Sequence, residues 1–154
     1  GPIVNPSKPQ CQMLGVANLD QMRLYNNVYR KIGIDYAIVN SIDGYDEISL
    51  TSGFKLITNY FEKVFTPKDL GLNYLDPHEI YGGSTPEEAW KIFDSVLEGT
   101  STEAQKNVII ANAACGIAVM DRNQSIEDSV LMAREALESG KALETFKKFV
   151  ELNS

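Results

Sequence analysis

The sequence predicts an α/β fold, in which a partial parallel sheet is flanked by helices and carries an appended antiparallel hairpin. Residues 34–39 form a short apolar run, Ile-Asp-Tyr-Ala-Ile-Val, with the length and composition of a buried parallel strand. A strand, a helix and this second strand follow one another with short connections, which is the order of a right-handed βαβ unit with parallel strands. From residue 86 onward the chain has helical periodicity almost throughout.

The βαβ unit begins after a turn-rich segment, residues 1–12, in which three prolines exclude a regular helix. Residues 13–16 then form a short apolar strand. Asn18 or Asp20 is positioned to cap the helix that follows, and Gly33 ends it. The spacing of six residues predicts one apolar face on this helix: Leu19, Met22, Tyr25, Val28, Tyr29 and Ile32.

Further strands are expected after the second apolar run. Residues 47–50 and 54–58 have strand-like composition, and residues 60–65 alternate in side-chain character. Asn59 predicts a turn between the last two segments, and therefore an antiparallel hairpin. Residues 66–71 supply a Thr cap, a Pro at the first helical position and a Gly terminator, so one helical turn is expected there.

Three amphipathic helices are predicted in the second half of the chain. Residues 86–97 form the first. Ser125 caps the second, whose first turn is acidic, and Gly140 separates it from the last, residues 141–152. Four apolar residues of the last helix are expected to face inward: Leu143, Phe146, Phe149 and Val150.

A long helix is predicted between them, capped by Ser101 or Thr102 and running to about Met120. Its centre is apolar on nearly every side, so the helix must be buried. Asn112 is the polar residue in this apolar run and needs a hydrogen-bonding partner inside the protein. We interpret its role as structural rather than catalytic.

The composition indicates a compact, acidic piece of protein. Its 154 residues, 44% of them hydrophobic, are enough to bury a core. The net charge of −7, from 21 acidic and 14 basic residues, argues against a nucleic-acid-binding surface. No apolar run approaches the length of a membrane span. Cys11 and Cys115 lack the spacing of a metal or redox motif, so we expect reduced thiols in a cytoplasmic protein.

An acidic loop follows the strand of residues 34–39. It contains Asp43, Asp46 and Glu47, with Gly44 to let the chain turn. In an open α/β sheet ligands bind beyond the carboxyl ends of the strands, and this loop falls at such an end. Adjacent carboxylates repel one another unless a cation lies between them, so Asp46 and Glu47 are candidate Mg²⁺ ligands. The residues alone also allow a second interpretation, in which the loop is a solvated acidic turn that caps the next element.

The segment DGYDEIS, residues 43–49, resembles the DGLDEIS motif of the anthranilate phosphoribosyltransferases. Further likeness to that family follows in the family's order, in GPIVNPSKPQCQMLGV, YGGSTPEEAW, NVIIANAACGIAV and LMAREALESGKALE. The resemblance covers nearly the whole chain. It implies a nucleoside phosphorylase/phosphoribosyltransferase-like carboxy-terminal domain.

The family's glycine-rich pyrophosphate loop, of the form GTGGD, is not found in this sequence. Residues 1–154 therefore resemble the carboxy-terminal portion of the glycosyltransferase-family α/β domain, without the amino-terminal helical domain. The resemblance implies that this portion is inactive by itself. It also implies exposed apolar surface where the missing amino-terminal half would dock.

The activity implied by the resemblance is that of a transferase of tryptophan biosynthesis. Such an enzyme moves the phosphoribosyl group of phosphoribosyl pyrophosphate (PRPP) to anthranilate with Mg²⁺, and a homodimeric parent is expected. Asp46 and Glu47 would hold the metal, with Asp43 behind them. Asn5, Asp43 and Gly44 are the candidate substrate-binding residues. No residue of this chain is expected to act as an acid–base catalyst, because the reaction depends on neutralising charge and aligning substrates.

Other interpretations stay open at this point. The chain could belong to an enzyme like the class II pyrimidine nucleoside phosphorylases, or be a non-catalytic structural or interaction module. Residues 81–88 place two glycines before the start of a helix, an arrangement that can bind an anion. Acidic residues in the first turn of that helix can instead cap it internally. We favour capping. His78 is interpreted as a surface or capping residue rather than a base.

Overall fold

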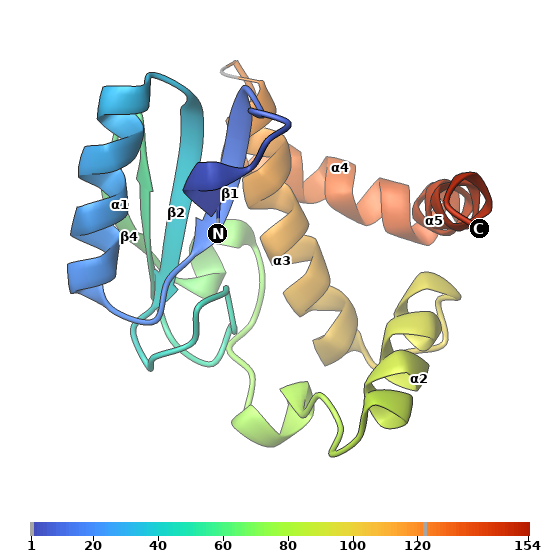
Figure 1. Ribbon diagram of the computed structural model, residues 1–154. Coiled ribbons are helices and arrows are strands. Elements are labelled where there is room, and N and C mark those ends of the chain that lie inside the picture. The colour runs from blue at the N-terminus through green and yellow to red at the C-terminus, as the bar shows by residue number, and fades with distance from the viewer. Residues whose placement is uncertain (1, 122) are drawn as a thin grey trace.

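The computed structural model describes residues 2–121 and 123–154 as a mixed sheet of four strands with helices on both faces. Helix α1 (Leu19–Ile32) covers one face of the sheet and α3 (Glu103–Met120) covers the other (Figure 1). The strands follow one another across the sheet in chain order. The predicted α/β architecture is confirmed.

The sheet combines one parallel pair with an antiparallel hairpin. Strands β1 (Cys11–Gly15) and β2 (Asp35–Ser41) are parallel, as the βαβ order predicts. Strands β3 (Phe54–Thr58) and β4 (Glu62–Phe65) form the hairpin, and β3 pairs with β2 in the antiparallel sense. The carboxyl ends of β1 and β2 therefore lie at the same edge of the sheet.

Strand β2 separates two apolar clusters, because successive side chains of a strand point to opposite faces. Tyr36 and Ile38 pack on the side of α1, together with Met22 and Tyr29. Residues Ala37 and Val39 face the larger cluster, which includes much of α3. Since β2 is covered on both faces, apolar side chains alternate between the two clusters over residues 36–39.

The helices begin and end at residues that the sequence marks. Asn18, rather than Asp20, caps α1 by accepting a hydrogen bond from the Gln21 N–H at 2.9 Å. Gly33 ends that helix with φ of 79°, a left-handed conformation that glycine adopts without strain. Thr85 caps α2 (Pro86–Leu97), Thr102 caps α3, and Ser125 caps α4 (Ile126–Glu138).

Short 3-10 helices and one terminal helix complete the chain. The 3-10 helices are η1 (Pro2–Val4), η2 (Pro67–Leu70) and η3 (Pro77–Ile80). Helix α5 (Lys141–Leu152) packs against α2 through three aromatic rings, with Phe146 5.0 Å from Phe93 and 6.1 Å from Trp90. None of the helices among residues 2–121 and 123–154 combines the length and hydropathy that a membrane span needs.

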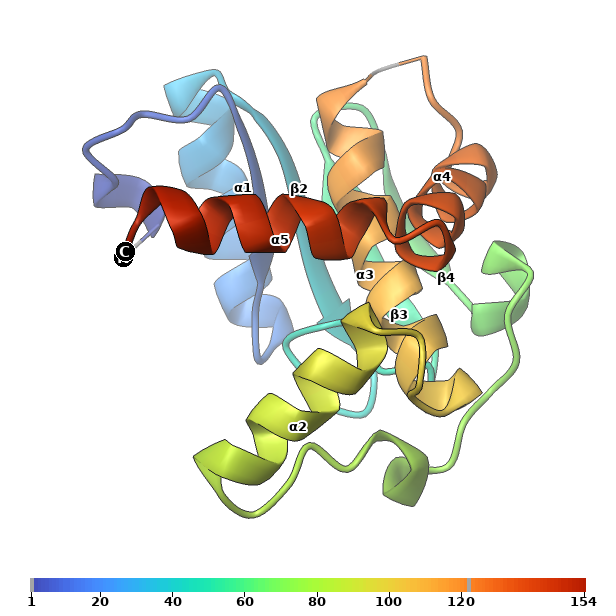
Figure 2. The ribbon, with the colours of Figure 1, turned by 90° about the vertical axis from the view of Figure 1, so that its right-hand side faces the viewer.

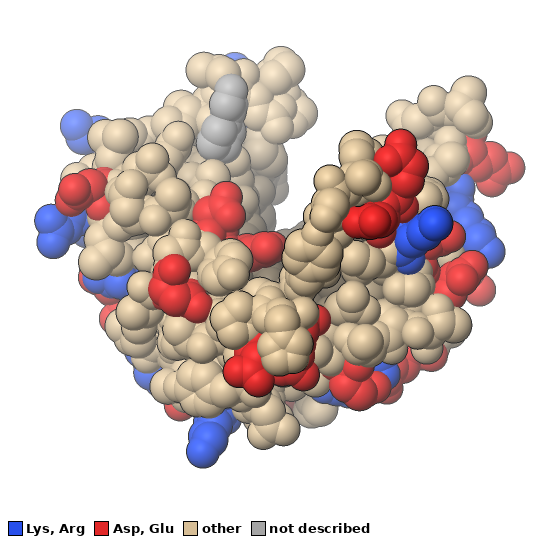
Figure 3. Space-filling view, turned by 90° about the horizontal axis from the view of Figure 1, so that it is seen from below, with Lys and Arg blue, Asp and Glu red and all other residues tan. Residues whose placement is uncertain are grey.

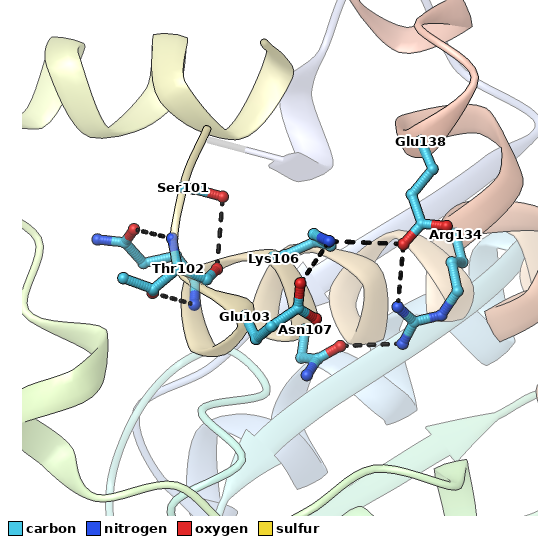
Figure 4. A network of polar contacts seen from close by, with 8 residues as sticks. Ser101, Thr102, Glu103, Lys106, Asn107, Arg134 and Glu138 are labelled. Atoms are coloured by element: carbon cyan, nitrogen blue, oxygen red, sulfur yellow. Dashed lines mark hydrogen bonds and ion pairs between the residues drawn. The ribbon is translucent and has the colours of Figure 1, made fainter. Parts of the chain in front are cut away.

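A polar network joins α3 to α4 (Figure 4). Lys106 Nζ lies 2.6 Å from a Glu103 carboxylate oxygen and 3.6 Å from one of Glu138. Arg134 pairs with the same Glu138 oxygen at 3.3 Å and donates a hydrogen bond to Asn107 Oδ1 at 2.9 Å. The network therefore links α3 and α4 through charged groups at their contact.

One strand prediction is wrong, and another is wrong in its extent. Residues 47–50 form no strand, because Ile48 bonds to a side chain of α3 and Leu50 has φ of 62°, which no extended ladder contains. The predicted strand of residues 60–65 is shorter by two residues. The Thr58 N–H donates to the Phe61 carbonyl at 2.9 Å, so residues 60 and 61 belong to the turn.

The predicted inward face of α5 is only partly confirmed. Phe146 packs as expected, but Phe149 is 62% exposed and Val150 is 47% exposed. Figure 2 shows that α5 crosses in front of the rest of the chain, with nothing over its carboxy-terminal half. Amphipathic spacing identifies a face that favours burial, but burial itself requires a neighbouring element.

Candidate metal-binding loop

The acidic loop leaves β2 at its carboxyl end and lies across the end of β1, on the lower side of the molecule in Figure 1. Asp46 and Glu47 are both exposed on this loop. A Cβ atom at Gly15 would lie 1.6 Å from the Asp46 carbonyl oxygen, so the last residue of β1 must be glycine for the loop to sit here. The structure therefore places both predicted metal ligands where an α/β sheet binds its ligands.

Hydrogen bonds from β2 fix the loop backbone. The Ser41 N–H donates to the Tyr45 carbonyl at 2.9 Å, and the Ser41 hydroxyl donates to the Glu47 carbonyl at 2.6 Å. Asn40, which is almost fully buried, donates through Nδ2 to the Val16 carbonyl at 2.7 Å. These bonds tie the loop to the ends of both parallel strands.

A side chain of α3 holds the loop from the other side. Asn112 Oδ1 accepts a hydrogen bond from the Ile48 N–H at 3.0 Å, and Asn112 Nδ2 donates to the Ile48 carbonyl at 2.9 Å. The structural role expected for Asn112 is confirmed, since its amide is fully used. Its partner is the residue that directly follows Glu47.

Gly44 and Asp43 shape the tip of the loop. Gly44 has φ of 100°, which a side chain would strain, and its N–H donates to the Ser41 carbonyl at 3.0 Å. The Asp43 carboxylate accepts hydrogen bonds from the hydroxyl groups of Thr51 and Ser52. Asp43 therefore closes the loop on its own chain, whereas Asp46 and Glu47 project into solvent.

The surroundings of the loop are acidic on one side and apolar on the other. Seen from below in Figure 3, several Asp and Glu side chains gather on the face to which β1 and β2 point. Glu47 lines a hollow of about 280 Å³ whose other walls come mainly from α2 and α3, including Phe93, Val108 and Ile109. Across residues 2–121 and 123–154, no three His, Cys, Asp or Glu side chains converge as a metal cage.

Two adjacent exposed carboxylates on a fixed loop fit Mg²⁺. This ion is commonly held by one or two carboxylates, and it keeps its other positions for waters and substrate phosphate oxygens. A complete cage of protein ligands would instead suit a structural metal. Asp46 and Glu47 therefore suit an ion that is shared with a substrate better than they suit a structural metal.

The other candidates are not brought to this loop. Asn5 accepts hydrogen bonds from the Ser7 N–H and hydroxyl at 3.0 and 2.7 Å, which forms a local turn before β1. His78 is exposed in η3. The chain itself caps the start of α2, as the capping interpretation expects. The Thr85 hydroxyl accepts a hydrogen bond from the Glu88 N–H, and the Glu88 carboxylate accepts one from the Ser84 N–H at 2.7 Å.

Comparison with models of protein families shows to which family the chain belongs. The model of the glycosyl transferase family, a/b domain, matches residues 1–143. The chain belongs to this family. Residues 43–49, which carry the resemblance in sequence, form the loop described above.

Curated relatives within this glycosyl transferase family are anthranilate phosphoribosyltransferases. The chain is 56% identical to that of Phocaeicola vulgatus over 154 residues, which is 100% of this chain and 46% of the relative. It is also 56% identical to that of Bacteroides fragilis over 153 residues, 99% of this chain and again 46% of the relative. The chain thus spans about half the length of the curated relatives it matches.

Solved structures share the fold. Anthranilate phosphoribosyltransferase from Saccharomyces cerevisiae in complex with PRPP and Mg superposes with a TM-score of 0.86 at 22% sequence identity. The match covers 98% of this chain and 44% of the yeast protein. This agreement confirms the expected phosphoribosyltransferase-like α/β fold.

Sequence reasoning missed Gly15 and left the partner of Asn112 unknown, although both residues position the loop. Gly15 has no signature in the sequence, because its close contact with Asp46 joins segments 31 residues apart. Asn112 did carry a signal as the polar residue in an apolar helix, but its partner could be found only from the fold.

Proposed function

We propose that the intact protein is an anthranilate phosphoribosyltransferase, which transfers the phosphoribosyl group of PRPP to anthranilate. In this proposal residues 1–154 form the carboxy-terminal portion of its α/β domain. The observation that carries the proposal is the 56% identity to the Phocaeicola vulgatus enzyme over the whole chain.

Mg²⁺ is the cofactor in this proposal, and Asp46 and Glu47 are its ligands from this chain. Support comes from their exposure on a fixed loop and from the yeast relative, whose structure was solved in complex with PRPP and Mg. When bound, the ion supplies positive charge for the departing diphosphate. That charge matters here, because this chain carries a net charge of −7 and would otherwise repel a polyanion.

The chain's own residues hold and aim the ion. Ser41 and Gly15 fix the backbone at Glu47 and Asp46, so the two carboxylates require little reorganisation when the substrate arrives. Alignment of the anthranilate amine with the anomeric carbon would depend on residues outside this chain. We therefore expect no turnover from the 154-residue chain alone.

The remaining portion of the protein is proposed to cover a notch in the surface. Figure 3 shows this notch, which lies between the half that contains the sheet and the half that contains α2 and α5. Strand β1 is the first in the sheet order, so one of its edges has no strand partner in the described chain. Apolar side chains exposed on the helices include Trp90, Ile109, Phe149 and Val150. Exposed apolar groups of this kind mark a surface that is covered in the complete protein.

The cellular setting belongs to the same proposal. We place the intact protein in the cytoplasm as a homodimer, as the family resemblance implies. Cys11 and Cys115 are both free in the structure, which agrees with a reducing compartment.

The decisive experiment uses the double variant Asp46→Asn with Glu47→Gln in the intact protein. Turnover of PRPP and anthranilate at saturating Mg²⁺ is expected to fall by about 100-fold or more, because both ligands lose their charge. The double variant Glu144→Gln with Glu151→Gln removes the same charge from the exposed side of α5 and should keep wild-type turnover. Unchanged Mg²⁺-dependent turnover in the first variant would refute the metal assignment.

A second assay separates the two enzyme classes. The intact wild-type protein is given either PRPP with anthranilate or thymidine with inorganic phosphate. Product only from the first pair is expected. Phosphorolysis of thymidine without anthranilate turnover would favour a nucleoside phosphorylase, and no product from either pair would favour the non-catalytic module.

A further inference from the structure

The acidic loop is held by a side chain 64 positions away in the sequence. Asn112 projects from α3, and its amide meets the Ile48 backbone with one acceptor and one donor, at 3.0 and 2.9 Å. Asn112 Nδ2 uses its second hydrogen to donate to the Val108 carbonyl oxygen of the same helix, at 2.9 Å. With both amide hydrogens and the oxygen engaged, the side chain has one orientation.

Ile48 transmits this contact to the acidic pair. It directly follows Glu47, and its own side chain is fully buried in the core. On the other side of the pair, Gly15 lies against the Asp46 carbonyl. The backbone is therefore fixed on both sides of Asp46 and Glu47.

The two carboxylates themselves remain available. Within the described residues, no side chain donates a hydrogen bond to the carboxylate of Asp46 or Glu47, since the Ser41 hydroxyl bonds the Glu47 backbone carbonyl. Their orientation thus depends on how the backbone is held, not on partners of their own. A loop built this way offers oxygen ligands at a fixed place without neutralising them.

We infer that Asn112 is a positioning residue for metal binding, which acts through the backbone of Ile48 on the carboxylates of Asp46 and Glu47. This inference rests on the proposed function, because it assumes that the pair holds Mg²⁺. Removal of groups that orient metal ligands typically weakens metal affinity by about 10- to 100-fold. Loss of Asn112 should therefore weaken the binding of Mg²⁺ and leave the binding of anthranilate unchanged.

Two variants of the intact protein test this role. Asn112→Ala removes the contact with Ile48, whereas Asn107→Ala, on the same helix, removes the hydrogen bond from Arg134. In Asn112→Ala the Mg²⁺ concentration for half-maximal turnover should rise about tenfold or more, while the KM for anthranilate changes by less than about twofold. Asn107→Ala should leave both values unchanged.

Amide hydrogen exchange of residues 46–52, measured without Mg²⁺, gives a readout that needs no activity. Exchange there should be about tenfold faster in Asn112→Ala than in Asn107→Ala, since an open loop loses its protection. If Asn112→Ala does not fold, Asn112→Asp takes its place. Asp keeps the size and the acceptor for the Ile48 N–H but loses both donors, and faster exchange and a higher Mg²⁺ requirement are again expected.

The outcomes separate the inference from the proposed function. Loop exchange and Mg²⁺ requirement that match those of Asn107→Ala would overturn the role of Asn112 and leave the enzyme assignment standing. A wild-type protein without Mg²⁺-dependent turnover would instead refute the proposed function. In that case unchanged loop exchange in the Asn112 variant would still overturn the positioning role.

Discussion

The carbonyl oxygen of Asp46 occupies the space that a side chain at Gly15 would need, since a Cβ atom built there falls 1.6 Å from that oxygen. This contact seats the acidic loop on the end of β1. No displacement of a flexible side chain could relieve such an overlap, because the opposing atom belongs to the backbone. The position of the acidic loop therefore depends on the absence of one methyl group.

Gly15→Ala is expected to destabilise the 154-residue chain by about 1–3 kcal/mol, because the added methyl group must push the loop away. Urea unfolding measures the change. Gly116→Ala is the matched control, since a Cβ atom there meets nothing within 4 Å in α3, and it should stabilise the helix by about 0.5–1 kcal/mol. Equal stability of Gly15→Ala and wild type would show that the loop moves freely.

Phe149→Ala distinguishes the isolated chain from the intact protein. In the 154-residue chain the cost should be below about 0.5 kcal/mol, because Phe149 is 62% exposed. In the intact protein the same change should cost about 2–4 kcal/mol, as expected for a covered phenylalanine. Phe146→Ala should cost about 2 kcal/mol or more in both forms, since its ring packs on Phe93. A small effect of Phe149→Ala in the intact protein would remove α5 from the proposed docking surface.

The two cysteines should react differently with thiol reagents. Burial raises the pKa of the Cys115 thiol to about 12, so almost none of the reactive thiolate is present at pH 8. Cys11 is only half-buried at the start of β1. Titration of the native chain with a disulfide reagent should therefore label Cys11 alone, and the variant Cys11→Ser should stay unlabelled until it is unfolded. Rapid labelling of native Cys11→Ser would contradict the burial of Cys115.

Asp69 should make η2 sensitive to acid. Hydrogen bonds from the Thr66 N–H and then from its hydroxyl, each 2.7 Å long, lower the pKa of the Asp69 carboxyl. A lowered folded-state pKa gives stability that is complete above the unfolded value of about 3.9. That stability is lost as the pH falls through the lower, folded pKa. An NMR titration of the carboxyl group should give a midpoint below 3.9, and Thr66→Ala should move it upward. A midpoint at the ordinary value would show that the capping box does not persist in solution.

Local features were predicted from the sequence where the physical cause is local. Helix α2 begins and ends at the predicted residues, because Thr85 caps it and Pro86 suits its first position. The hairpin was likewise visible, since Asn59 is a turn-forming residue between two strand-like segments. Such signals lie within short sequence segments.

Failures occurred where a distant segment decides the outcome. Residues 47–50 have strand-like composition, but the Asn112 amide takes the hydrogen bonds of Ile48 that a neighbouring strand would have used. Phe149 has helical spacing with Phe146, yet Phe146 packs on Phe93 of α2 whereas Phe149 is largely exposed. Neither result can be read from the segment itself.

The sequence by itself determined the βαβ order, the helix caps and the acidic motif of residues 43–49, because propensity, periodicity and turn chemistry act over a few residues. Only the tertiary structure decided that Asp46 lies against Gly15, that Ile48 is held by Asn112, and that Asp43 bonds within its own loop. These contacts join segments brought together by burial of the apolar clusters on both faces of β2. Packing, rather than local preference, therefore sets the geometry of the two exposed carboxylates.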